Sequence, residues 1–135
     1  MMTSCFRFSF SAAHFYQQKN WSAEKNKNEF GKCFSQYGHG HDYVVECNWL
    51  TTSPQQQTEL DQLTKSVREI FDHHHLNFMF HEFSDKVPTT ENLALLIKQK
   101  LEESAKIKPQ LATAKLLNLK VYETPEIWVE IAPMV

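Results

Sequence analysis

The sequence predicts an α+β protein in which an antiparallel sheet of four strands carries two helices on one face. Two observations lead to this fold class. Alternating apolar and polar residues, typical of half-buried strands, occur in four segments, at about 4–14, 39–50, 115–123 and 127–132. Apolar residues at helical spacing occur in two further segments, 55–71 and the stretch after Thr89 or Thr90. The order β-β-α-α-β-β fits a single domain over residues 1–135.

The first two strands bring histidines to the core side of the sheet. Three phenylalanines share one parity in the first strand, and His14 ends their row. In the second strand, His39 and His41 share one parity with Tyr43 and the apolar residues that follow. Side chains alternate between the faces of a strand, so His14 should lie at the end of the core-facing row, with His39 and His41 on one face of the neighbouring strand.

The two helices have distinct sequence signals. The first has an apolar stripe made of five residues, Leu60, Leu63, Val67, Ile70 and Phe71. The second should begin at a capping hydroxyl of Thr89 or Thr90, with Glu91 in the first turn, where the helix dipole favours an acid. The polar residues 17–37 are interpreted as one long loop, and residues 72–88 as a polar and aromatic connection.

The composition is that of a folded domain without a strongly charged partner. Hydrophobic residues make up 41% of the chain, charged residues 22%, and the net charge is −2. This charge shows no nucleic-acid footprint, and the apolar runs are far shorter than the ~20 residues that span a bilayer. The N-terminus lacks the apolar region of a secretory signal, and the three cysteines lack a disulfide framework. We therefore expect a cytoplasmic protein with reduced thiols that binds neither nucleic acid nor membranes.

The motif His39-Gly40-His41 predicts a metal site. Two histidines at i and i+2 on a strand point the same way, and Gly40 between them allows close approach. His14 is the natural third ligand. Three imidazoles with one open position are typical of catalytic zinc. The alternative is that two of these histidines are hydrogen-bonded surface residues.

Three further features could belong to such a site. Cys33 precedes the histidine pair in the polar loop, and its thiol could be a base or nucleophile, a fourth ligand or an inert group. Asp72 and His73 could form a carboxylate–imidazole pair or a solvated turn. Glu123 closes the inward row of Leu117, Leu119 and Val121, which is costly without a partner. It could accept two N–H groups side by side, or it could simply be exposed where the strand ends.

Taken together, these features resemble the 6-pyruvoyltetrahydropterin synthase / 6-carboxytetrahydropterin synthase family. Five stretches carry the resemblance, in the same order as in the family and over almost the whole chain. They are Phe8-Ser-Phe-Ser-Ala-Ala-His14, Cys33-x5-His39-Gly-His41-Asp-Tyr43, Asp72-His-x-x-Leu76-Asn77, Pro88-Thr-Thr-Glu-Asn-Leu93 and Val121-Tyr-Glu-Thr124. The chain departs from the family in a shorter segment between residues 49 and 60, in Asp42 where Asn is common, and in the Lys- and Asn-rich segment 17–32.

The resemblance implies a role for each candidate residue. His14, His39 and His41 match the zinc ligands, and Cys33 matches the general base. Asp72 and His73 match a proton-relay pair. Glu123 matches the acid that anchors the pterin ring, and Thr89 and Thr90 match the segment that lines its pocket. The implied cofactor is Zn²⁺.

The implied activity is that of a carbon–oxygen lyase acting on 7,8-dihydroneopterin triphosphate. The product would be 6-carboxytetrahydropterin of queuosine synthesis, which we favour from the Asp-His-x-x-Leu-Asn run and the ending Glu123-Thr-Pro-x-x-Trp128-x-Glu130, or 6-pyruvoyltetrahydropterin, which the Cys-x5-His-Gly-His spacing resembles. Three other hypotheses remain: a non-catalytic zinc- or pterin-binding module, an enzyme for a related guanine-derived substrate, and a structural zinc protein with Cys33 as fourth ligand.

The resemblance also implies the T-fold, in which trimers close a continuous β-barrel, two trimers stack, and active sites lie between subunits. The predicted sheet favours such an assembly independently, because an open sheet has two edges whose backbone groups can pair with another subunit. We therefore expect a homo-oligomer, either a trimer or a hexamer.

Overall fold

A computed structural model of the chain describes residues 1–35 and 38–132. The four predicted strands are present as β1 (Met2–His14), β2 (His39–Thr51), β4 (Lys115–Tyr122) and β5 (Trp128–Ile131). A fifth, very short strand, β3 (His74–His75), lies at one edge of the sheet, in the order β3-β1-β2-β4-β5. β3 runs parallel to β1, whereas the other pairs are antiparallel. The predicted α+β class is therefore confirmed, with a sheet that does not close on itself within one chain.

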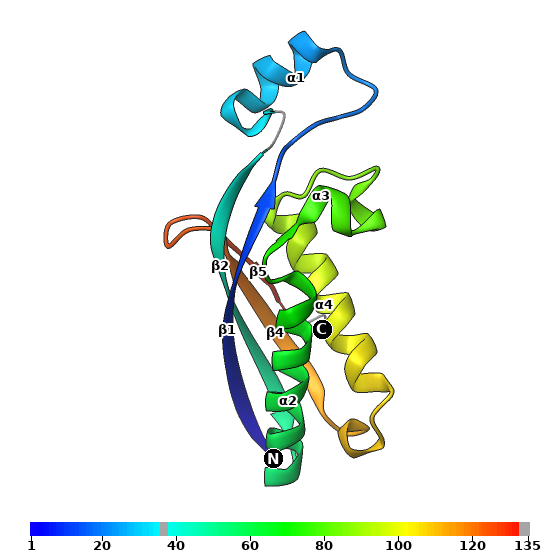
Figure 1. Ribbon diagram of the computed structural model, residues 1–135. Helices are drawn as coiled ribbons and strands as arrows, with labels where there is room; N and C mark the ends of the chain where they lie inside the picture. Colours follow the sequence, from blue (N-terminus) through cyan, green and yellow to red (C-terminus); the bar gives the residue numbers. More distant parts are fainter. Residues whose placement is uncertain (36–37, 133–135) are drawn as a thin grey trace.

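Two long helices, α2 (Pro54–Phe71) and α4 (Thr90–Lys106), cover one face of this sheet (Figure 1). The hydroxyl of Ser53 caps α2, and the hydroxyl of Thr89 accepts a hydrogen bond of 3.2 Å from the backbone N–H of Asn92 and so caps α4. Thr89 is thus the cap and Thr90 the first helical residue. Each helix in the described ranges is too short or too polar to cross a lipid bilayer.

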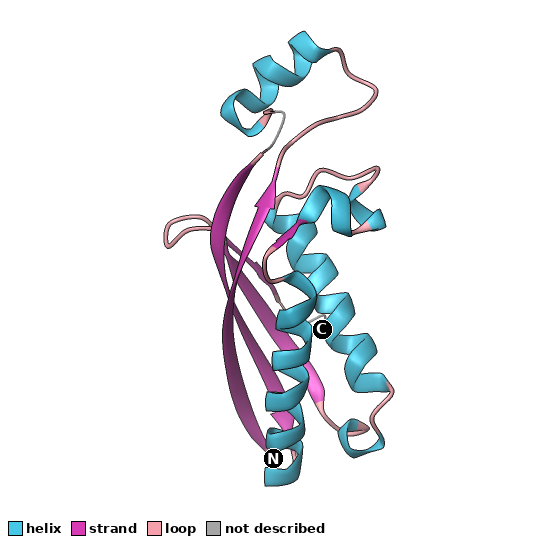
Figure 2. Cartoon of the chain, viewed as in Figure 1, coloured by secondary structure: helices cyan, strands magenta, loops and turns pink. Residues whose placement is uncertain are grey.

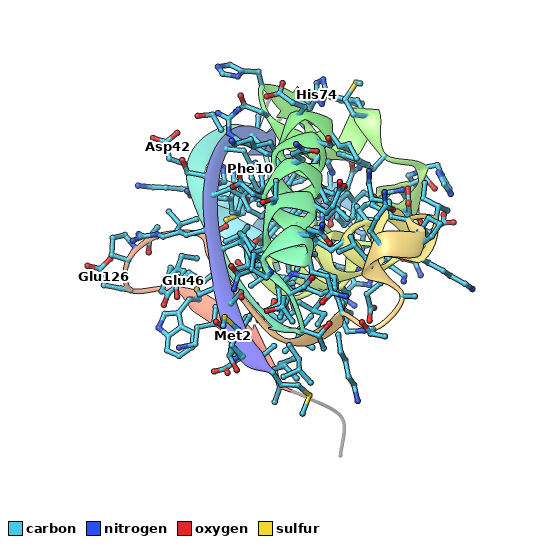
Figure 3. All side chains as sticks on the ribbon, turned by 90° about the horizontal axis from the view of Figure 1, so that it is seen from below. Met2, Phe10, Asp42, Glu46, His74 and Glu126 are labelled. Atoms are coloured by element: carbon cyan, nitrogen blue, oxygen red, sulfur yellow. The ribbon has the colours of Figure 1, made fainter. Side chains whose placement is uncertain are left out.

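The core fills the space between the sheet and these two helices. Figure 3 shows Phe10 between β1 and α2, while Asp42 and Glu46 point to the opposite side of the sheet. The first-helix stripe is buried as predicted, except for Ile70, which is 38% exposed. A bulge in β4 pairs Leu116, and not Leu117, with Trp49. The expected inward row of β4 is therefore corrected at its start, because the extra residue shifts the alternation.

The helix-free face of the sheet is polar and its charges are in register. Arg7 lies opposite Glu46, which lies opposite Lys120, which in turn lies opposite Glu130. Opposite charges therefore alternate across four strands, an arrangement that stabilises cross-strand pairs. β5 forms one edge of the sheet, and its partly buried Val129 and Ile131 pack against the core.

The long loop predicted over residues 17–37 contains regular structure, so that expectation was wrong in part. It includes α1 (Ala23–Phe30) and the 3-10 turn η1 (Gly31–Cys33), while residues 36–37 lie outside the described part of the chain. The helix has no apolar stripe that periodicity could reveal. It is held instead by the Ser22 cap and by the buried Asn26 side chain, which bonds to backbone groups before the helix.

The connection after α2 also contains short elements. β3 is followed directly by α3 (Leu76–Met79) and then by the 3-10 turn η2 (His81–Phe83), and a further turn, η3 (Pro109–Leu111), leads into β4. The parallel pairing of β3 with Ala12 and Ala13 keeps this connection beside the end of β1. The end of β1 is therefore held between β2 on one side and β3 on the other.

Candidate metal centre and active site

The three predicted metal ligands converge at one end of the β1–β2 ladder. The register pairs His14 with His39 and Ala12 with His41, so the two strand ends place all three imidazoles side by side. The Nε2 atoms of His14 and His39 are 3.1 Å apart, and one ligand atom from each histidine lies within 4.8 Å of the others. Their ring centroids are separated by 4.7 to 5.0 Å. This grouping favours a shared site over the alternative that two of these histidines are merely hydrogen-bonded surface residues.

This donor set fits a zinc ion. Nitrogens bound to one tetrahedral zinc ion, at 2.0–2.1 Å each, lie about 3.3 Å from one another. The pair of His14 and His39 has this spacing. In the described part of the chain, the ligand atoms that lie within 4.8 Å of one another belong to the three histidines, and the thiol of Cys33 is not among them. Three protein ligands leave a position open for substrate, as catalytic zinc sites do.

The surroundings of the cluster favour neutral imidazoles, which can bind a cation. Burial, reinforced by the neighbouring imidazoles, lowers the pKa of His14 to about 3. Burial also lowers the pKa of His41, although the charge of Glu123 acts in the opposite direction. Both rings are therefore held toward the neutral form, which is the form that offers a lone pair to a metal ion.

Tyr43 supports His14 from behind. Its hydroxyl lies 2.8 Å from His14 Nδ1, and both side chains are fully buried. When Nε2 of an imidazole holds a metal ion, the proton is on Nδ1. Nδ1 then donates to the Tyr43 hydroxyl, which orients the ring and fixes its tautomer. Parity identified Tyr43 as a core residue, but its contact with a ligand could not be read from the sequence.

Glu123 is part of this site and is not an exposed strand end. Its Oε1 atom lies 3.6 Å from His14 Nε2 and 3.5 Å from His41 Nε2, and its side chain is only 11% exposed. The backbone N–H of Glu123 donates to the carbonyl of Ile127, which fixes the residue at the start of the β4–β5 turn. The carboxylate therefore stands beside the metal centre, where it can meet a bound molecule.

Cys33 is a half-buried free thiol at the end of η1. Burial raises its pKa, and the nearby charge of Glu123 raises it further. A divalent cation at the three histidines would act in the opposite direction and favour the thiolate. The backbone carbonyl of Cys33 accepts a hydrogen bond of 2.7 Å from the N–H of Tyr16, a residue that the sequence did not single out.

Asp72 and His73 form the predicted carboxylate–imidazole pair, with His73 Nδ1 2.9 Å from Asp72 Oδ2. The backbone N–H of Ser11 donates to Asp72 at 2.9 Å, and Arg68 forms an ion pair with it at 3.2 Å. The ring of His73 is 81% exposed. A groove of about 470 Å³ is lined by His73 and also by His41, so the pair opens onto the edge of the metal centre. Within the described residues, the hydrogen bonds and ion pairs of Asp72 and His73 lead to β1 and α2 and not to the three-histidine cluster.

The two threonines have structural positions at the start of α4. Thr89 caps the helix, and Thr90 is 5% exposed. The Asn92 side chain also donates to the carbonyl of Val87, which tightens the entry to the helix. A role for Thr89 and Thr90 in lining a ligand pocket stays a prediction.

Two features of this site were missed or misassigned from the sequence. The glycine that the geometry requires is Gly38, whose φ is +78° and whose added Cβ would lie 2.3 Å from the carbonyl oxygen of His14. A Cβ on Gly40 would meet only an ordinary contact of 3.6 Å, so the sequence argument chose the wrong glycine. The second feature is Asn77, whose side chain forms two hydrogen bonds of 2.9 Å with the N–H and carbonyl of Phe15.

Fold and site together define an α+β protein of the T-fold class with a cluster of three histidines that could hold a metal ion. Comparison with known proteins identifies the family within this fold class. The sequence pattern of the family described as 6-pyruvoyl tetrahydropterin synthase matches residues 4–133, so the chain belongs to this family.

Its relatives agree with this assignment. The 6-pyruvoyl tetrahydrobiopterin synthase of Homo sapiens is 35% identical over 125 residues, which cover 87% of this chain and 82% of that protein. The protein of the same name from Drosophila melanogaster is 34% identical over 127 residues, or 89% of this chain and 73% of that protein. The solved structure of Caenorhabditis elegans 6-pyruvoyl tetrahydropterin synthase superimposes with a TM-score of 0.83 and 27% identity, over 98% of this chain and 96% of that one.

Proposed function

We propose that the protein is a zinc-dependent carbon–oxygen lyase that converts 7,8-dihydroneopterin triphosphate to a 6-substituted tetrahydropterin. The observation that carries this proposal is the convergence of His14, His39 and His41, with the carboxylate of Glu123 3.5 to 3.6 Å from two of their nitrogens. A pterin synthase needs both elements: a metal site for the substrate side chain and an acid for the ring.

The proposed product is 6-pyruvoyltetrahydropterin. The sequence alone favoured the 6-carboxy product of queuosine synthesis, but the relatives carry the name of the pyruvoyl enzyme. The Cys-x5-His-Gly-His spacing supports the same branch. Product analysis separates the two branches, because the side chains that they leave on the ring differ in mass.

The residues divide the work as follows. Zinc at the three histidines would supply Lewis acidity, which withdraws charge from the side-chain oxygens of the substrate and acidifies the adjacent C–H. Cys33, as thiolate, removes that proton, and the triphosphate leaves with the electron pair of its C–O bond. The carboxylate of Glu123 accepts hydrogen bonds from the amino group and the ring N–H of the pterin and so fixes the ring. The pair Asp72–His73 moves protons on the other side of the substrate.

The position of Asp72–His73 favours a site shared between subunits. His73 is exposed and touches β1 of its own chain, so its free ring edge can reach a substrate held by a neighbouring copy. The open edge at β5 and the charged helix-free face support assembly into a trimer or hexamer, with backbone pairing between subunits. We further propose a cytoplasmic location, which the three free cysteines support.

The decisive experiment is incubation of the zinc-loaded protein with dihydroneopterin triphosphate, followed by identification of products by mass. Release of triphosphate together with a pyruvoyl-substituted tetrahydropterin is expected. A carboxy-substituted product would move the protein to the other branch. Binding of zinc and pterin without turnover would instead identify a non-catalytic binding module.

A further inference from the structure

Tyr16 lies between the metal centre and the segment that carries Cys33. Its ring centroid is 4.9 Å from that of His14. On its other side the ring meets Phe30, at the end of α1, edge to face at 5.6 Å. Its backbone N–H donates to the carbonyl oxygen of Cys33 at 2.7 Å. One residue therefore contacts a metal-cluster imidazole, the last turn of α1 and the proposed general base.

In the described ranges, the segment that carries Cys33 has few other hydrogen bonds or ring contacts with the sheet. Figure 2 shows α1 and η1 as an excursion beyond the strand ends, away from α2 and α4. The hydrogen bonds of the Asn26 side chain stay inside this excursion, as does the stacking of Trp21 on Phe30 at 5.5 Å. Within residues 1–35, the hydrogen bonds and ring contacts that join it to the end of β1 are those of Tyr16.

We propose that Tyr16 is a positioning residue that sets where the Cys33 thiol stands relative to the three histidines. The inference rests on the proposed role of Cys33 as the base. A general base must lie within hydrogen-bond reach of the proton that it removes. The contacts within α1 and η1 hold these two elements together but do not fix them relative to the three histidines. The contacts of Tyr16 join them to His14.

Among the described residues, the hydrogen bonds and ring contacts of Tyr16 run through its backbone and its ring. Burial, together with the nearby charges of Glu123 and Cys33, raises the pKa of its hydroxyl. The phenylalanine and alanine variants therefore separate positioning by the ring from chemistry by the hydroxyl. Phenylalanine can make the same ring contacts, so Tyr16→Phe should preserve the function. Alanine keeps the backbone hydrogen bond to Cys33 but loses the ring contacts with His14 and Phe30, so Tyr16→Ala should loosen the Cys33 segment while leaving the three histidine ligands in place.

The test measures the Cys33 thiol directly. In a Cys5→Ser background, iodoacetamide reports on Cys33, because Cys5 is exposed and Cys47 is fully buried. Zinc content, alkylation rate, kcat and KM are measured for the zinc-loaded Tyr16→Ala, Tyr16→Phe and Phe30→Ala proteins. Phe78→Ala, at a 71% exposed aromatic residue, is the matched control.

Tyr16→Ala should alkylate faster than the parent, because the half-buried thiol gains access to solvent. It should also lose about tenfold to a hundredfold in kcat, the scale of a displacement near 1 Å, with KM and zinc content nearly unchanged. Phe30→Ala should show the same changes to a smaller extent. Tyr16→Phe and Phe78→Ala should match the parent.

Two results would overturn the inference. One is Tyr16→Ala with the alkylation rate and kcat of the parent. The other is loss of zinc from Tyr16→Ala together with an unchanged alkylation rate and kcat in Phe30→Ala. Tyr16 would then only support His14 as a ligand. If alkylation responds as expected while even the parent protein fails to turn over substrate, the positioning role stands and the proposed function fails.

Discussion

Removal of the Tyr43 hydroxyl should weaken zinc binding more than it weakens the fold. Tyr43→Phe keeps the ring in the core but deletes the oxygen that lies 2.8 Å from His14 Nδ1. With zinc on Nε2, the Nδ1 proton would be buried without an acceptor, which costs about 1–3 kcal/mol. The zinc dissociation constant should therefore rise by about 5- to 150-fold.

The metal-free protein should tolerate the same change. Without zinc, the proton of His14 can move to Nε2, which lies 3.1 Å from His39 Nε2 and finds an acceptor there. Nδ1 then loses its donor, but phenylalanine has no hydroxyl to bury, so the free energy of unfolding of the metal-free variant should fall by less than the zinc-binding free energy.

Zinc affinity is measured by competition with a chelator, and stability by urea unfolding of the metal-free protein. Tyr122→Phe is the matched control, since its ring contacts Trp128 at 5.7 Å on the helix-free side of β4. An unchanged zinc affinity in Tyr43→Phe would refute the reasoning. An equal loss of stability with and without zinc would show instead that the hydroxyl serves packing.

Four further predictions address the remaining residues. His39→Ala should lose zinc and turnover together, and metal content that survives in this variant would contradict the ligand assignment. Cys33→Ala should keep zinc and substrate binding but lose about 100- to 10,000-fold in kcat, and zinc loss in this variant would reveal a fourth ligand. Glu123→Gln should act mainly on substrate affinity, at a cost of about 1.5–3 kcal/mol seen in direct binding measurements. Mixed oligomers of the Cys33→Ala and His73→Ala variants should regain activity if the site is shared between subunits. Mixtures that are as inactive as each variant alone would place each site within one chain.

A last prediction concerns pH. The hydrogen bond from the Ser11 N–H, with smaller contributions from His73 and Arg68, holds the pKa of Asp72 below its usual 3.8. A lowered carboxyl pKa stabilises the fold above the usual value, and this contribution disappears as the pH falls through the lowered value. In Asp72→Asn, the free energy of unfolding should therefore fall less steeply as the pH decreases below about 4. An unchanged pH dependence in this range would show that the contact contributes nothing to stability.

The sequence by itself determined which faces the chemical groups occupy. Strand alternation put His14 at the end of a core-facing row, and the same alternation put His39 and His41 on one face of the next strand. Periodicity is a local property, so it could be read without knowing the neighbours. The roles of Cys33 and Glu123 came from the family resemblance, because nothing local distinguishes a catalytic thiol from an inert one.

Only the tertiary structure decided how those faces meet. The register of β1 on β2 set the spacing of the imidazoles, and the close approach of His14 made Gly38, and not Gly40, the required glycine. The helix α1 escaped the sequence analysis because a buried amide, Asn26, holds it where other helices use an apolar stripe. Contacts between segments far apart in the chain, such as Tyr43 on His14, leave no periodic trace in the sequence and arise only when the strands pair.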